Sequence, residues 1–384
     1  MDFSLGPEQR AIVDTVCSFV HRELQPHEDL VERLDEVPVL LAESIRATAL
    51  AAGIYAANMP AELGGGGLDP FDVTLVEREL GATSYALQAL VGRPSNILQA
   101  CAGEQVDRYL LPTIRGERHD CLAMTEPEAG SDVRSMTTRA RRDGTDYLIT
   151  GTKHFISHAD TADFVILFAV TGEERSTGRA AISAVLVDHG TPGLTIRRGS
   201  ASVSHRGYHH CEVSFQECRV PAAQLLGEEG KGFELLGRWL GASRLSVAAF
   251  SVGRARRVLA DTVRWAARRR QFGRPIGDFQ GVSFQLADMA TELEAAELLT
   301  LQAAARLREG RMSDRDAAMA KLYASEMLGR LTDRAVQIFG GMGLVAELPI
   351  ERFWRDARVE RIWDGTSEVQ RHIISRSLLR TGGE

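Results

Sequence analysis

The stretch RIWDGTSEVQR, Arg361 to Arg371, places one acidic residue, Asp364, on a glycine-containing turn just before the predicted last helix. Ser367 and Gln370 have the spacing of a capping box, which would open that helix. A capping box explains Ser367 but requires no carboxylate at Asp364. The stretch therefore leaves two interpretations of Asp364: a polar lead-in to a helix, or a catalytic base on a loop.

Outward from this stretch, the chain is helical, then strand-like, then helical again. Residues 1–120 have apolar residues at helical spacing, as in FSLGPEQRAIVDTVCSFVHREL. Residues 121–227 contain short β-type runs bounded by turns, such as DFVILFAV and AISAVLVD. Residues 228–384 return to long helical patterns, one of which ends at Gly310, a predicted C-terminal cap. We predict an α+β fold with an N-terminal helical domain, a middle antiparallel β domain and a C-terminal helical domain, because this order excludes a doubly wound α/β sheet.

Composition narrows the function classes. The net charge of −7 argues against nucleic acid as the main partner, since no basic surplus is available to neutralise phosphates. No apolar run approaches the roughly 20 residues that span a bilayer, and the N-terminus has no signal or transit pattern. Five scattered cysteines without a CxxC pair suggest neither a disulfide framework nor a metal site. We therefore expect a cytoplasmic protein that has no membrane partner.

Three motifs are excluded as sites. GGMGLVA approaches a dinucleotide fingerprint, but it follows a helical pattern and not a strand. GEEGKGF lacks the spacing of a phosphate-binding P-loop. HRGYHHCE gathers His205, His209, His210 and Cys211, yet no second ligand pair at zinc spacing occurs elsewhere. We expect that segment to be a surface loop.

Two segments of the β region suggest a site for a flat, polar ligand. AMTEPEAGSDVRSMTT combines turn formers with hydroxyl groups at the entry to the β region. GTKHFISHAD follows after one hairpin and offers Phe155 as an aromatic face beside the hydroxyl of Ser157. Either segment alone is a weak signal, since turns rich in Pro, Gly and Asp are common.

Together with RRRQFGRPIGDFQ, QIFGGMG and RIWDGTSEVQR, in this order and at these separations, the two segments resemble the acyl-CoA dehydrogenases. This family of flavoproteins desaturates acyl thioesters at the α,β bond. The similarity runs from EQRAIVDTV to QRHIISRSLL. It implies an N-terminal α domain, a middle barrel-like β domain and a C-terminal four-helix bundle. It also implies FAD between the β domain and the C-terminal helices, a site completed by a neighbouring subunit, and a homotetramer.

The resemblance further implies which residues contact FAD. Those expected at the flavin are Leu122, Ala123, Met124, Thr125, Phe155, Ile156 and Ser157, with Ser131 near the pyrophosphate or pantetheine. Those expected from the partner subunit are Arg269, Phe272, Gln280, Gln337, Ile338, Phe339, Gly340 and Gly341. Those expected near the AMP end are Thr366, Ser367 and Glu368.

In the family, a carboxylate removes the α proton while the β hydrogen leaves as hydride to the flavin. The resemblance implies Asp364 as this base, although Glu is usual there. Some relatives place the base just before the helix Arg, but this chain has Ser243 there, which cannot serve. Asp is one methylene shorter than Glu, so we expect a shifted loop or a deeper substrate, with Trp363 contributing to the change in packing.

Substrate contacts are expected from Ser131, Arg244 and Gly365. Many relatives have Asp three residues before the helix Arg, where this chain has Gly241. The substrate could therefore be an acyl group bound to a carrier protein as well as an acyl-CoA. An electron-transfer flavoprotein is the expected electron acceptor. Two other functions also remain open: a flavin oxidase or monooxygenase on the same fold, since oxidases acting on nitroalkanes use Asp, and a non-catalytic flavin- or acyl-binding subunit.

Overall fold

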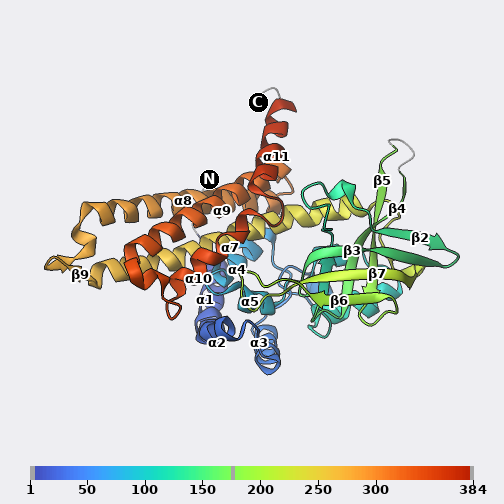
Figure 1. Ribbon diagram of the computed structural model, residues 1–384, viewed down its shortest axis with the longest axis horizontal. Coiled ribbons are helices and arrows are strands. Elements are labelled where there is room, and N and C mark those ends of the chain that lie inside the picture. Colours follow the sequence, from blue (N-terminus) through green and yellow to red (C-terminus); the bar gives the residue numbers. More distant parts are fainter. Residues whose placement is uncertain (1–4, 174–177, 381–384) are drawn as a thin grey trace.

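The computed structural model describes residues 5–173 and 178–380 and has a helical part at one end and a β part at the other (Figure 1). The N-terminal helices lie against the middle of the long C-terminal helices. They are α1 (Pro7–Phe19), α2 (Glu28–Leu34), α3 (Val39–Ala51), α4 (Pro70–Leu80), α5 (Tyr85–Gln88) and α6 (Leu111–Ile114).

Helix α4 shows how local sequence sets a helix start. Asp69 is the N-cap, and its carboxylate accepts hydrogen bonds from the backbone N–H groups of Phe71 and Asp72. Pro70 occupies the first helical position, where its missing N–H group is no loss. The helix then packs closely on the C-terminal part, because Gly81 and Gly253 let the two backbones meet. A Cβ added at Gly253 would lie 1.7 Å from the carbonyl oxygen of Arg78.

The β part is one sheet of eight strands in the order β6-β7-β3-β2-β4-β5-β8, with β1 paired to β4. Its pairings are antiparallel except those of β1 and β2 with β4. Its strands are β1 (Asp120–Ala123), β2 (Arg139–Asp143), β3 (Asp146–Ser157), β4 (Phe164–Glu173), β5 (Ala180–Asp188), β6 (Leu194–Arg198), β7 (His210–Pro221) and β8 (Leu225–Leu226). The first seven residues of β4 are buried, as expected for a central strand covered on both faces.

The C-terminal part is a bundle of long helices. Its elements are α7 (Gly232–Arg268), the hairpin strands β9 (Arg270–Gln271) and β10 (Arg274–Pro275), α8 (Gln280–Arg308), α9 (Asp314–Phe339), α10 (Pro349–Asp356) and α11 (Ser367–Arg380). Helices α7, α8 and α9 pack on one another, and α11 packs on α9 while its end projects from the body (Figure 1). Helix α8 ends at Arg308, and Gly310, the predicted C-terminal cap, follows it in left-handed conformation with φ +67°.

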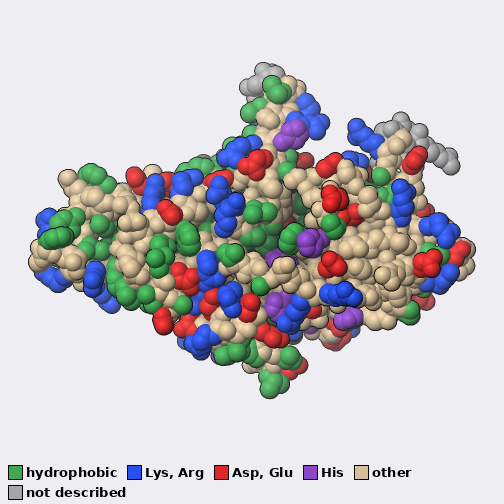
Figure 2. Space-filling view, in the orientation of Figure 1, with side chains coloured by type: hydrophobic (Ala, Val, Ile, Leu, Met, Phe, Trp, Pro, Cys, Tyr) green, Lys and Arg blue, Asp and Glu red, His purple; other side chains and the backbone are tan. Residues whose placement is uncertain are grey.

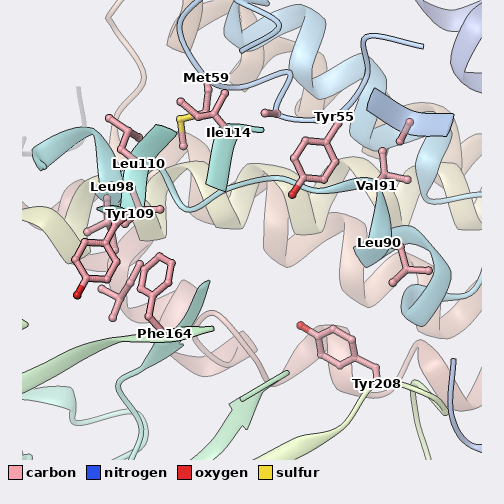
Figure 3. Packing of buried hydrophobic residues seen from close by; sticks show 14 of the residues in the cluster. Tyr55, Met59, Leu90, Val91, Leu98, Tyr109, Leu110, Ile114, Phe164 and Tyr208 are labelled. Atoms are coloured by element: carbon pink, nitrogen blue, oxygen red, sulfur yellow. The ribbon is translucent and has the colours of Figure 1, made fainter. Parts of the chain in front are cut away.

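One apolar core joins the three parts. It includes Tyr55 and Leu90 from the N-terminal part and Phe164 and Tyr208 from the β part (Figure 3). Leu236 of α7 belongs to the same core. The predicted α+β fold, with its helical, β and helical parts, is confirmed. In residues 5–173 and 178–380, no helix is long and apolar enough to span a membrane. The same residues contain no cluster of three or more His, Cys, Asp or Glu side chains that could hold a metal ion.

Candidate active site

Asp364 lies on a strained turn between a 3-10 segment, Val359–Arg361, and helix α11. It adopts φ +52°, and Gly365 after it adopts φ +93°. Left-handed backbone is costly for most residues, but Asp is among the side chains that tolerate it best. A Cβ at Gly365 would also lie 2.7 Å from Nε2 of Gln370, so the turn requires glycine there.

Hydrogen bonds to backbone carbonyl groups hold this turn. Nε2 of Gln370 donates to the carbonyl oxygens of Asp364 (3.2 Å) and Gly365 (2.7 Å). Nζ of Lys321, on α9, donates to the carbonyl oxygen of Gly365 at 2.9 Å. Nε of Arg244, on α7, lies 3.4 Å from the carbonyl oxygen of Asp364. The turn is therefore fixed to two helices of the bundle as well as to α11.

The predicted capping box at Ser367 and Gln370 is wrong. Gln370 holds the turn and does not reach back to the N–H group of Ser367, and Ser367 donates its hydroxyl to Glu326 at 2.7 Å. The hydroxyl of Thr366 accepts from the N–H group of Val369 at 3.3 Å and caps the helix. The sequence pattern misled because Thr366 and Ser367 are adjacent cap formers, and the strained turn shifts the cap by one residue.

The Asp364 carboxylate faces α7. The Ser243 hydroxyl donates to its Oδ2 atom at 2.7 Å. Burial raises the pKa of Asp364, and the hydrogen bond from Ser243 and the charges of Lys321, Arg93 and Arg244 only partly oppose it. The residue as a whole is only partly buried. Among the described residues, none accepts a hydrogen bond from the Asp364 N–H group. The turn thus presents a carboxylate of raised pKa and a free N–H donor.

Replacing Ser243 by Ala should move the acid limb of the pH–rate profile to higher pH. The hydrogen bond from Ser243 stabilises the ionised carboxylate, so its loss raises the pKa of Asp364 further. A base works only when deprotonated, and activity is therefore lost as pH falls through that raised value. The check is kcat/KM against pH for both proteins; an acid limb that stays in place would show that Asp364 does not govern it.

A buried charged network lies beneath the turn. Glu360 accepts a hydrogen bond from NH1 of Arg254 at 2.5 Å and from the indole N–H group of Trp363 at 2.7 Å. Nε2 of His205 lies 3.2 Å from the same carboxylate. The side chains of Glu360, Arg254 and His205 are all fully buried. Burial alone would raise the pKa of Glu360, but His205 and Arg254 outweigh it and hold this pKa below its usual value. Through Trp363, the network anchors the residue next to Asp364.

The prediction that HRGYHHCE is a surface loop is wrong for most of its length. His205 is 2% exposed and Cys211 is fully buried. Nδ1 of His209 lies 3.2 Å from Asp160, and Nδ1 of His210 lies 3.4 Å from the Ser157 hydroxyl. Figure 2 shows histidine side chains gathered near the middle of the molecule, where the helical and β parts meet. The segment is therefore part of the wall of this junction.

The segment Leu122 to Thr125, predicted to face flavin, is rigidly held. The N–H group of His154 donates to the carbonyl oxygen of Thr125 at 2.8 Å. Nζ of buried Lys153 donates to the carbonyl oxygen of Met124 and to the Glu126 carboxylate, both at 2.9 Å. Glu126 also accepts from the N–H groups of Thr137 and Thr138. These bonds place the segment beside the end of β3, which carries Phe155, Ile156 and Ser157.

Phe155 and Ser157 differ in setting. Phe155 adopts φ +56°, is 64% exposed and stacks on His154 with ring centroids 4.0 Å apart. Such an exposed aromatic ring on a left-handed residue offers a flat face to a ligand. Ser157 is partly buried, and Ile156 between them is buried. Ser131 lies exposed on the loop after β1.

The residues predicted to act from a partner subunit lie at the opposite end of the molecule. The β9–β10 hairpin, which carries Phe272, is at the far end of the bundle from β3 (Figure 1). Two adjacent cavities of about 440 and 320 Å³ open there. They are lined by Arg269, Phe272, Gln337, Ile338, Phe339, Gly340 and Gly341 among others. Gln280 starts α8 next to them. One chain therefore does not bring the two predicted halves together.

The chemistry of this far end fits the adenosine diphosphate half of a dinucleotide. Trp265 and Phe339 stack with ring centroids 4.7 Å apart, which provides a flat apolar surface. The Arg269 guanidinium lies 6.0 Å from the Trp265 ring and is exposed, so it can contact a phosphate. Gly340 adopts φ +62°, and a Cβ at Gly341 would meet no atom within 4 Å. A ligand can approach the backbone closely there.

The remaining predicted residues sit near the Asp364 turn. Glu368 lies exposed at the start of α11, 3.8 Å from Arg371. Arg244 is buried, and burial lowers its pKa. Sequence reasoning missed Lys321, Glu360, Arg254, Tyr85 and Tyr208, which all surround the turn. Only Lys321 could have been noticed in the sequence, because it is one of only three lysines in the chain and lies within a strongly periodic helical segment.

Comparisons with known proteins agree with this architecture. Family models described as the N-terminal, middle and C-terminal domains of acyl-CoA dehydrogenase match residues 6–117, 121–218 and 230–379. A probable acyl-CoA dehydrogenase of Bacillus subtilis, YngJ, is 37% identical over 99% of this chain and 100% of its own.

Solved structures give the same result. Butyryl-CoA dehydrogenase from Megasphaera elsdenii superposes with a TM-score of 0.92 at 34% identity, covering 99% of this chain and 100% of that one. PigA with FAD and proline superposes with a TM-score of 0.91 at 29% identity, covering 100% of both chains. The chain belongs to the acyl-CoA dehydrogenase family.

Proposed function

We propose that this enzyme uses FAD to dehydrogenate an acyl thioester between its α and β carbons, with Asp364 as the base. One observation carries the proposal. A carboxylate of raised pKa is fixed on a turn by bonds from Gln370, Lys321 and Arg244, and no described residue accepts a hydrogen bond from the N–H group of the same residue. A general base needs such a fixed position and a pKa closer to the working pH.

The two groups of Asp364 have complementary roles. The α C–H group of a thioester is a weak acid until its carbonyl oxygen is stabilised as an enolate. The free N–H group of Asp364 supplies a hydrogen bond to that oxygen, while its carboxylate takes the α proton. FAD, when bound, supplies the acceptor for the β hydrogen and its electron pair. The product is the α,β-unsaturated thioester, and Ser243 helps to hold the carboxylate in place.

The distance between the two predicted halves of the cofactor site supports a site that is shared between subunits. We propose that the flavin lies beside Leu122 to Thr125 and Phe155 to Ser157 of one subunit, and that the diphosphate and adenine meet Arg269 and Gln337 to Gly341 of another. Thr366 and Glu368 would contact the AMP end. At least a homodimer is then needed, and a homotetramer would contain two such pairs.

Complementation tests this arrangement. Arg269→Glu should lose at least about tenfold in FAD retention, because a charge that favours phosphate is reversed. Asp364→Asn should bind FAD without turnover. When both variants are co-expressed in equal amounts, random pairing gives dimers in which one site has both intact halves, and about a quarter of the wild-type activity should return. Activity no higher than that of the separate variants would contradict a shared site.

The proposal also covers the groups that would bind the thioester arm and the partner that would accept the electrons. Arg244, Ser131 and Gly365 would contact the thioester arm. A Cβ at Gly241 would meet only Met312, at 3.7 Å, so this position offers no polar contact to pantetheine. Acyl-CoA and a carrier-protein thioester are both compatible with a glycine at this position. An electron-transfer flavoprotein would reoxidise the cofactor.

Anaerobic mixing of the FAD-loaded enzyme with acyl-CoA thioesters tests the function. Bleaching of the flavin absorbance together with an enoyl product, identified by mass spectrometry, is the expected result. Rapid peroxide formation from the reduced enzyme in air would instead indicate a flavin oxidase. Thioester binding without bleaching across all acyl groups would contradict the proposed reaction.

A further inference from the structure

Two tyrosines border the space between Asp364 and the Ser157 hydroxyl. Tyr85 starts α5, and Tyr208 lies in the loop before β7, from which its ring extends towards the N-terminal helices (Figure 3). Their ring centroids are 4.7 Å apart, in an edge-on arrangement. Tyr85 also contacts Trp363 at 4.8 Å. Trp363 precedes Asp364 in the chain, so the pair of tyrosines adjoins the base.

The two phenol groups lie between Asp364, the proposed base, and Ser157, which is expected at the flavin. The polar groups of Ser157 and Tyr85 act on the Tyr208 hydroxyl and lower its pKa. Burial is the larger effect and raises the pKa of Tyr208 to about 12, and burial raises that of Tyr85 well above its usual value. Both hydroxyls therefore stay protonated in the working range. They can donate to a ligand as well as accept from it.

Other neutral polar groups continue this lining. Gln88 follows Tyr85 by one helical turn, is 6% exposed, and its Oε1 atom has no hydrogen-bond partner among the described residues. The His158 ring contacts Tyr208 at 3.9 Å, and burial lowers its pKa to about 3, so it is neutral.

An aliphatic chain fits this lining poorly. Under the proposed function, Cα lies at Asp364 and Cβ near the flavin beside Ser157. Atoms beyond Cβ then meet the hydroxyls of Tyr85 and Tyr208 and the rings around them. Saturated carbon cannot satisfy such buried polar groups, and leaving them unpaired is costly. The same aromatic rings limit the length available.

We propose that the acyl group is short and carries a hydrogen-bonding oxygen or nitrogen beyond Cβ, which pairs with the hydroxyls of Tyr85 and Tyr208. These two tyrosines are then the specificity-determining residues of the site. The inference rests on the proposed function and narrows its substrate class.

A matched panel of CoA thioesters tests the inference. Pentanoyl-CoA and 4-hydroxybutyryl-CoA have equal numbers of acyl heavy atoms and differ in a terminal CH₃ or OH group. Anaerobic flavin reduction should give 4-hydroxybutyryl-CoA a kcat/KM at least about tenfold above that of pentanoyl-CoA, because a site built for a hydroxyl rejects its isostere. The kcat/KM for octanoyl-CoA should be lower than that for butyryl-CoA. Equal values for the matched pair, or faster octanoyl-CoA, would overturn the inference and leave the proposed function standing.

Variants assign the effect to the tyrosines. Tyr85→Phe should lower the 4-hydroxybutyryl to pentanoyl ratio by about fivefold or more, the loss of one hydrogen bond. Tyr147→Phe, in the core of the β part, is the matched control and should keep the wild-type ratio. Tyr85→Ala should raise kcat/KM for octanoyl-CoA relative to butyryl-CoA. A ratio unchanged in Tyr85→Phe would overturn the assignment. Failure of every thioester to bleach wild-type enzyme would instead contradict the proposed function, and the inference with it.

Discussion

Asp364→Asn should slow anaerobic flavin reduction by about 10³-fold or more, since general bases contribute up to roughly 10⁴-fold. The change is nearly isosteric and leaves an oxygen able to accept from Ser243. It removes only the capacity to take a proton. The bonds from Gln370, Lys321 and Arg244 go to backbone carbonyl groups and do not depend on the side chain at residue 364. The turn should therefore keep its conformation.

Two further measurements separate loss of the base from loss of structure. Asp364→Asn should keep its FAD and its melting temperature, and it should bind substrate thioester with a similar Kd. Asp364→Glu adds one methylene and restores the longer side chain usual in the family. It should retain part of the activity, because a carboxylate is still present. Parental activity in Asp364→Asn would show that another group takes the proton.

Glu360→Ala should produce the largest loss of stability, about 3–5 kcal/mol in the free energy of unfolding. The substitution leaves the Arg254 guanidinium buried without its counter-charge, and Nε and NH2 of this side chain already have no partner among the described residues. His205 and Trp363 lose the same acceptor. Calorimetry should show a melting temperature lower by at least about five degrees.

Two controls distinguish a buried pair from charge in general. Adding Arg254→Met to Glu360→Ala removes the uncompensated charge and should recover part of the lost stability. Arg219→Ala breaks an exposed pair with Asp143 and should leave the melting temperature unchanged. Equal losses in Glu360→Ala and Arg219→Ala would contradict the account of the network.

The fold could be predicted because its signals are local. Helical spacing before residue 120, short strands between turns, and long periodic helices after residue 228 each reflect the packing of one element. The turn at Asp364 was also recognisable, since the glycine after an acidic residue marks left-handed backbone. The capping box was misplaced because a sequence pattern cannot show which of two adjacent hydroxyl residues follows the strained turn.

The surroundings of Asp364 could not be predicted, because they assemble residues far apart in the chain. His205 and Glu360 are separated by 155 positions, and Arg254 and Glu360 by 106. His205 was assigned to a surface loop because the residues near it in sequence do not indicate that Glu360 would be buried beside it. Tyr85 and Tyr208 meet only when α5 packs against the β part. Such contacts depend on tertiary packing, which the spacing of apolar residues along the chain does not reveal.

The central claim is that Asp364 removes the α proton of a thioester. Deuterium incorporation at the α carbon tests it most directly. The FAD-loaded enzyme is incubated without oxygen in D₂O with the thioester that reduces its flavin fastest, and the recovered thioester is analysed by mass spectrometry. The wild-type enzyme should incorporate deuterium at the α carbon, and Asp364→Asn should do so about 10³-fold more slowly. Equal incorporation by the two proteins would contradict the claim.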